Sequence, residues 1–97
     1  MTDVRPFEIE IPDSALADLR ARLALTRFPE KETPVDWTQG VPLAYMQEIR
    51  TYWADRYDWR KTEARLNAIP QFRTTIDGVP IHFLHVESKH ENALPLE

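Results

Sequence analysis

The sequence predicts an α+β fold: an N-terminal strand, two to three helices in a meander, and a β-hairpin. Three observations lead to this prediction. Apolar and charged residues alternate near the N-terminus, as in a half-buried strand. Apolar residues then recur at helical spacing through the middle of the chain. Near the C-terminus, Asp77-Gly78 separates two runs of β-forming residues, which is the strongest short-range signal for a hairpin.

The first strand and the first helix are expected within the first 28 residues. Phe-Glu-Ile-Glu-Ile over residues 7–11 alternates with the period of a strand, and Pro12 ends it. A helix is predicted over residues 13–27, with Asp13 or Ser14 as its cap. Its apolar stripe consists of Leu16, Leu19 and Leu23.

A proline-rich loop and an aromatic helix come next. The loop at residues 29–42 carries Trp37, so we expect it to be held against a surface. Pro42 suits the first position of a helix, because its missing N–H would have no partner there. This helix is predicted over residues 42–59, with apolar side chains covering an arc of roughly 200°. They form two stripes: Leu43, Met46, Ile49, Trp53 and Tyr57, and beside them Tyr45, Tyr52 and Trp59.

The rest of the chain predicts a short helix, the hairpin and a tail. The helix at residues 61–68 completes a meander over residues 1–70, and the hairpin occupies residues 71–87. The second strand is almost continuously apolar, as expected if both of its faces are covered. Residues 88–97 are polar and predict a flexible tail.

Composition argues against several classes of protein. The 97 residues include two distant glycines, so no phosphate-binding loop or nucleophile elbow can form, and there is no cysteine. A net charge of −4 argues against a nucleic-acid partner. No apolar run is long enough to span a membrane, and no signal peptide is visible, so a cytoplasmic location is expected.

Residues that could carry chemistry have simpler explanations. His82 and His85 form an H-x-x-H pair, which could bind zinc if it lay on a helix, but on the predicted strand the two side chains point to opposite faces. Surface solvation explains the carboxylate pairs Glu8/Glu10, Glu30/Glu32 and Asp55/Asp58. Nothing activates either serine. We therefore expect no catalytic residue, no cofactor and no metal site in this chain.

The aromatic content exceeds what the predicted elements can enclose. The chain has three tryptophans, three tyrosines and four phenylalanines, each able to bury ~150–250 Å². Core packing accounts for Met46, Ile49 and Trp53. The surplus predicts that one side of the aromatic helix rests on something outside this chain. The candidate contacts are Trp37, Tyr45, Tyr52, Trp53 and Trp59.

Several short motifs follow one another in a distinctive order. They include Thr26-Arg27-Phe28-Pro29, Trp37-Thr38-Gln39-Gly40-Val41-Pro42, Tyr57-Asp58-Trp59-Arg60, Glu63-Ala64-Arg65-Leu66-Asn67 and Phe72-Arg73-Thr74-Thr75-Ile76-Asp77-Gly78. This order resembles the N-terminal region of microsomal-type epoxide hydrolases, in their soluble bacterial form. The likeness runs from about Val4 to Leu96.

The resemblance implies that the hairpin is the start of an α/β-hydrolase sheet. It also implies a downstream aspartate nucleophile, a His–acid pair and two lid tyrosines. Together they would hydrolyse an epoxide to a vicinal diol through an ester intermediate, a detoxification reaction that needs no cofactor or metal. This chain lacks the H-G-W-P motif of that machinery. We therefore expect a piece of a longer enzyme, truncated before its catalytic domain, with Leu96-Glu97 resembling a cloning scar.

The expected role is a non-catalytic domain that braces and covers its own C-terminal hydrolase domain. The isolated fragment is then expected to self-associate through its exposed aromatic residues. The alternative is a free-standing module that uses the aromatic helix face to bind an apolar ligand or a partner helix. The reading frame beyond Leu96 would separate the two.

Overall fold

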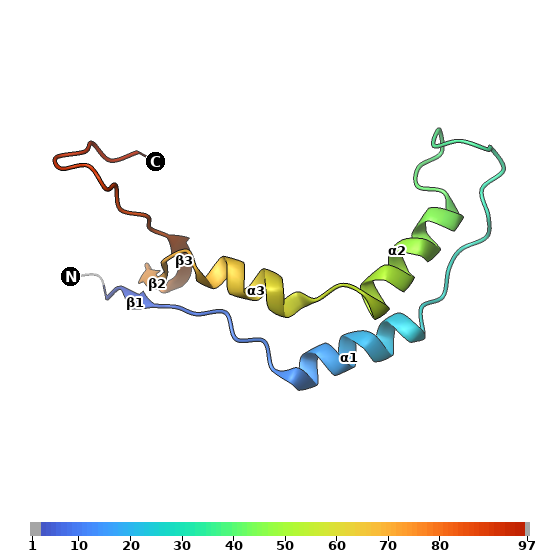
Figure 1. The fold of residues 1–97 in the computed structure, drawn as a ribbon, viewed down its shortest axis with the longest axis horizontal. Helices are drawn as coiled ribbons and strands as arrows, with labels where there is room; N and C mark the ends of the chain where they lie inside the picture. Colours follow the sequence, from blue (N-terminus) through green and yellow to red (C-terminus); the bar gives the residue numbers. More distant parts are fainter. Residues whose placement is uncertain (1–2, 97) are drawn as a thin grey trace. The chain divides into compact units, whose positions relative to one another are not determined.

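The computed structural model describes residues 3–96 and confirms the mixed α+β architecture, with a strand, three helices and a hairpin (Figure 1). The chain divides into two compact units, which are considered separately. One unit combines the N-terminal residues up to Glu10 with the chain from Arg60 onward, and the other is Ile11–Trp59. The elements are β1 (Arg5–Pro6), α1 (Asp13–Ala24), α2 (Leu43–Asp55), α3 (Trp59–Asn67), β2 (Gln71–Ile76) and β3 (Val79–Leu84).

The hairpin of β2 and β3 is the centre of a three-stranded antiparallel sheet in the order β1-β2-β3. Asp77 and Gly78 both have positive φ, at 51° and 79°, which a two-residue turn of this kind requires. Ile76 pairs with Val79 across the turn. Pro80 is therefore at a position whose backbone faces away from β2, where a missing N–H breaks no ladder bond.

The first strand is shorter and earlier than the alternation over residues 7–11 predicted. The ladder ends where the N–H of Phe7 donates to the carbonyl of Gln71 at 2.9 Å, because β2 begins at that residue. Beyond this point the side chain of Asn67 replaces a strand. Its Oδ1 accepts from the N–H of Ile9 and its Nδ2 donates to the carbonyl of Ile9, both at 2.8 Å.

Helix α1 begins at the predicted place but is capped and ended differently. Pro12, rather than Asp13 or Ser14, occupies the cap position, and no side chain caps it. The helix ends at Ala24 instead of residue 27, because the N–H of Leu25 is shared between the carbonyls of Ala21 and Arg22 and tightens the last turn. The predicted stripe of α1 is its less exposed side, consisting of Leu16, Leu19 and the buried Leu23.

The predicted helix over residues 42–59 is two helices in the structure. The N–H groups of Arg56 and Tyr57 both donate to the carbonyl of Tyr52 at 2.9 Å, which ends α2. Asp58 then directly precedes α3, the position at which aspartate favours the start of a helix. Pro42 is the cap of α2 rather than its first residue. Trp59 consequently begins α3 and does not belong to the second stripe of α2.

The described residues contain no fully buried side chain. In the sheet unit the buried residues are polar, Gln71 and Thr74; in the helical unit the buried hydrophobic residue is Leu23. The tail after β3 contains no helix or strand as far as Leu96. With so few buried apolar side chains among residues 3–96, neither unit encloses a hydrophobic core of its own.

No helix within the described part of the chain is both long enough and apolar enough to cross a membrane.

Candidate interaction surface

Helix α2 turns its apolar side away from α1. Its less exposed residues are Leu43, Arg50 and Ala54, which share one side of the helix at spacings of seven and four, and α1 is the helix that packs against it. The α2 aromatic face is the other side, and its residues are 38–52% exposed. It consists of Tyr45, Met46, Ile49, Tyr52 and Trp53.

This orientation corrects one prediction. Met46, Ile49 and Trp53 were expected in the core, yet they are 42%, 38% and 45% exposed. The reason is that α2 packs through an edge containing a small residue and an arginine, Ala54 and Arg50. The apolar stripe is left uncovered by this chain.

The loop before α2 is fixed to the helix at two points. Trp37 lies edge-to-face against Tyr45, with ring centroids 5.0 Å apart, and a turn closed by Gly40, at φ 110°, follows it. Asp36 accepts hydrogen bonds from the hydroxyl and the N–H of Thr38, which lower the pKa of Asp36. Trp37 is nevertheless 57% exposed and thus extends the uncovered surface next to Tyr45.

The second fixed point is Glu32, which its sequence context predicts to be a solvated surface carboxylate. Its Oε2 accepts from the N–H of Leu43 at 2.9 Å, so it caps α2 from eleven residues away while Pro42 offers no side-chain cap. This bond lowers the pKa of Glu32, because it favours the ionised carboxylate. This cap could not be predicted from the sequence, because a carboxylate that caps a helix across a loop has no characteristic spacing from the helix.

The five predicted contact residues thus have different surroundings. Trp37 and Tyr45 are in contact, and Tyr52 packs against Tyr57 with ring centroids 6.3 Å apart. Trp53 lies within the α2 aromatic face. The fifth residue, Trp59, is half-buried at the start of α3.

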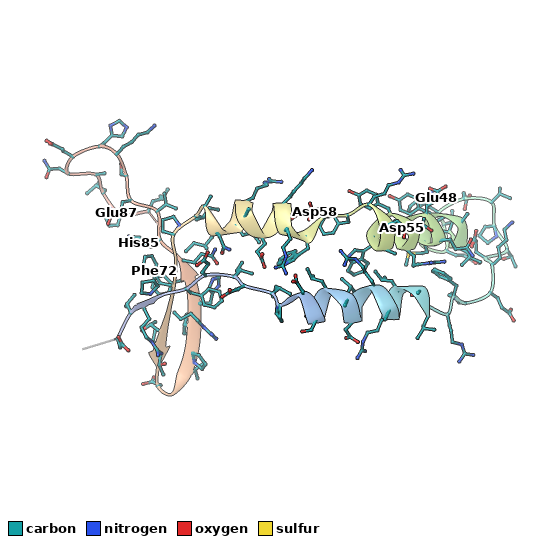
Figure 2. The ribbon with its side chains drawn as sticks, turned by 60° about the horizontal axis from the view of Figure 1, so that its bottom comes forward. Glu48, Asp55, Asp58, Phe72, His85 and Glu87 are labelled. Carbon is teal, nitrogen blue, oxygen red and sulfur yellow. The ribbon has the colours of Figure 1, made fainter. Side chains whose placement is uncertain are left out.

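The hairpin presents a second apolar surface, which the nearly continuous apolar sequence of its second strand predicts to be covered. Strand alternation and register place five apolar residues on one side, here called the apolar sheet face. They are Phe72, Ile76, Val79, Ile81 and Phe83. The rings of Phe72 and Phe83 are stacked, with centroids 5.7 Å apart. The ring centroid of Phe72 also lies 6.2 Å from that of His85, and both of these residues are labelled in Figure 2. Ile76 and Val79 are each 54% exposed, whereas Phe72 and Phe83 are half-buried, so the described chain covers this face only in part.

The opposite side of the sheet holds a polar network around Gln71. Its Nε2 donates to the carbonyl of Leu66 at 2.7 Å, and its Oε1 lies 2.9 Å from Nε2 of His82. An amide oxygen only accepts, so Nε2 of His82 carries the hydrogen. Phe7 packs edge-on against His82, and Arg73 lies over the ring of Phe7. The network ties the end of α3 to the sheet, and no group of three His, Asp or Glu residues in the described chain could hold a metal ion.

Comparison with known proteins places this geometry in a family. The family described as epoxide hydrolase N terminus matches residues 4–97. A relative from Stigmatella aurantiaca is 59% identical over 93 residues, which are 96% of this chain and 21% of the relative. Epoxide hydrolase 1 of Sus scrofa is 36% identical over 84 residues, which are 87% of this chain and 18% of that protein.

A solved structure matches over the same segment. The Aspergillus niger epoxide hydrolase has a TM-score of 0.87 and 35% identity, covering 96% of this chain and 25% of that one. The chain therefore spans about a fifth to a quarter of the relatives that it matches, which continue well beyond the segment. The chain belongs to the epoxide hydrolase N-terminal domain family of the microsomal-type epoxide hydrolases, within the α/β-hydrolase superfamily.

Proposed function

We propose that this chain is a non-catalytic domain that braces and covers the catalytic part of an epoxide hydrolase. One observation carries the proposal: each unit exposes a large apolar surface, the α2 aromatic face in one and the apolar sheet face in the other. Contiguous exposed apolar surface marks sites of packing or binding. The relatives continue for about four fifths of their length beyond the matched segment, which supplies a partner of sufficient size.

The described chemistry supports a structural role. His82 is bonded to Gln71, and His85 lies against Phe72. The two carboxylates with lowered pKa values, Glu32 and Asp36, owe them to backbone and hydroxyl donors nearby. Hydrolysis of an epoxide to a vicinal diol through an aspartyl ester would then depend on residues of the catalytic part.

A chimera tests the proposal. The matched segment of the Stigmatella relative is replaced by this chain, and the melting temperature and styrene oxide turnover are compared with those of the unaltered relative. We expect the chimera to approach both values and the relative without its segment to lose solubility or stability. If the truncated relative keeps its stability and turnover, the segment does not brace anything.

The isolated chain provides the second arm of the test. We expect it to bind an apolar dye, to self-associate in sedimentation experiments and to show no epoxide turnover. A monomeric chain that binds no dye would contradict the proposal, because it would lack the exposed apolar face, and turnover that survives rigorous purification would contradict the non-catalytic assignment.

A further inference from the structure

Arg50 of α2 has no hydrogen-bond or ion-pair partner within residues 3–96. Its side chain is half-buried, and its Nε is buried without an acceptor. A guanidinium remains charged at any physiological pH, and a buried donor that lacks an acceptor is costly. Because the Nε is already enclosed by this chain, an acceptor from another segment would bind the two Nη groups of Arg50.

None of the ion pairs found among the described residues joins Arg50 to a carboxylate. Within α2 the neighbours of Arg50 at spacings of three and four are Gln47, Met46, Trp53 and Ala54, none of them acidic. Glu48 and Asp55 also lie on α2 (Figure 2), but they are two and five positions away from Arg50 and do not share its side. On α1, Asp18 is already bonded to Arg22 at 2.9 Å.

The position of Arg50 connects it with the α2 aromatic face. It follows Met46 by four residues and precedes Trp53 by three, so it borders this face along its length. A partner that covers Met46 and Trp53 would also take the remaining donors of Arg50 out of water. Burial of the charge is then favourable only if the partner brings an acceptor, and a carboxylate compensates both the charge and the planar pair of donors.

We propose that Arg50 binds an aspartate or glutamate side chain of the catalytic part, on a segment that packs over Met46 and Trp53. This inference rests on the proposed function and names the chemistry of one contact within it. Arg50 is a positioning residue in this scheme and takes no part in the reaction.

The chimera described above carries the test, with Arg50→Gln, Arg50→Lys and the control Arg20→Gln. Arg20 is an exposed arginine on α1, so its substitution removes the same charge from the same unit. We expect Arg50→Gln to lower the melting temperature by at least about 2–4 °C and Arg20→Gln to change it little. Arg50→Lys should lie between them, because lysine keeps the charge but not the planar fork.

The pH dependence distinguishes a carboxylate from another acceptor. In the Arg50→Gln chimera an orphaned, buried carboxylate would have a raised pKa, so its cost is present at pH 8 and relieved as the pH falls towards 5. The gap in melting temperature to the unsubstituted chimera should therefore narrow over that range. A gap independent of pH would point to a backbone carbonyl, and equal effects of Arg50→Gln and Arg20→Gln would show that Arg50 has no partner. Either result overturns the inference, whereas a chimera that does not gain stability from this chain would contradict the proposed function itself.

Discussion

Trp53 offers the most direct measure of whether the α2 aromatic face is covered in the whole protein. The side chain is 45% exposed in this chain, and since a tryptophan can bury up to ~250 Å², about 110 Å² remains for a partner. At about 25 cal/mol per Å² of apolar surface, covering that area contributes about 2–3 kcal/mol. We expect Trp53→Ala to lower the free energy of unfolding of the chimera by at least this amount.

The assay is urea unfolding followed by far-UV circular dichroism, because a fluorescence signal would change with the loss of a tryptophan. Val35→Ala is the matched control, since Val35 belongs to the same unit and is fully exposed. Its substitution should change the free energy of unfolding by less than about 0.5 kcal/mol. Equal losses for Trp53→Ala and Val35→Ala would refute the reasoning, because they would mean that nothing covers the α2 aromatic face.

Three further predictions concern contacts inside the units, all measured in the chimera. Asn67→Ala leaves the N–H and carbonyl of Ile9 unpaired, so it should cost about 1–3 kcal/mol and speed amide exchange at Ile9; unchanged exchange would contradict the strand-like role of Asn67. Glu32→Gln weakens the cap on Leu43. Because the pKa of Glu32 is lowered in the folded protein, its stabilising effect is present above the ordinary value of 4.5 and is lost as the pH falls through the lowered value. Unfolding curves measured at a series of pH values should show that the free energy of unfolding falls less on acidification in Glu32→Gln than in the unsubstituted chimera. Identical pH profiles would rule the cap out. Gly78→Ala should cost about 1–2 kcal/mol, because φ is 79° while an added Cβ meets nothing within 4 Å; no loss in urea unfolding would show that the turn relaxes.

Elements whose signals are local could be predicted from the sequence. Asp77-Gly78 specifies the hairpin through two adjacent backbone conformations, and the stripe of α1 is set by spacing within twelve residues. The break between α2 and α3 had a local signal as well, in the aspartate at residue 58. Apolar periodicity continued across the break and concealed it, because a stripe of side chains does not report where the backbone hydrogen bonds stop.

Contacts between distant residues could not be predicted in this way. Asn67 pairs with Ile9 from 58 residues away, so the alternation that suggested a strand over residues 7–11 did not reveal that a side chain, and not a neighbouring strand, pairs with this segment. The candidate surface was visible as an excess of aromatic residues. Which side of α2 remains free could not be read from the sequence, because it depends on α1 packing against the edge that holds Arg50.

In both units, polar groups make the contacts within the unit while apolar side chains remain exposed. Within each unit, side-chain hydrogen bonds hold the chain in place: those of Gln71 and Asn67 in one, and that of Glu32 in the other. The apolar surfaces remain uncovered, and hydrophobic burial is the dominant favourable term in folding. Hydrogen bonds that contribute only about 1 kcal/mol each can select a conformation but cannot offset the entropy of ordering a chain of this length. A domain organised in this way should gain its stability when its apolar surfaces are covered, so substitutions on those surfaces should weaken the whole protein far more than they weaken the isolated chain.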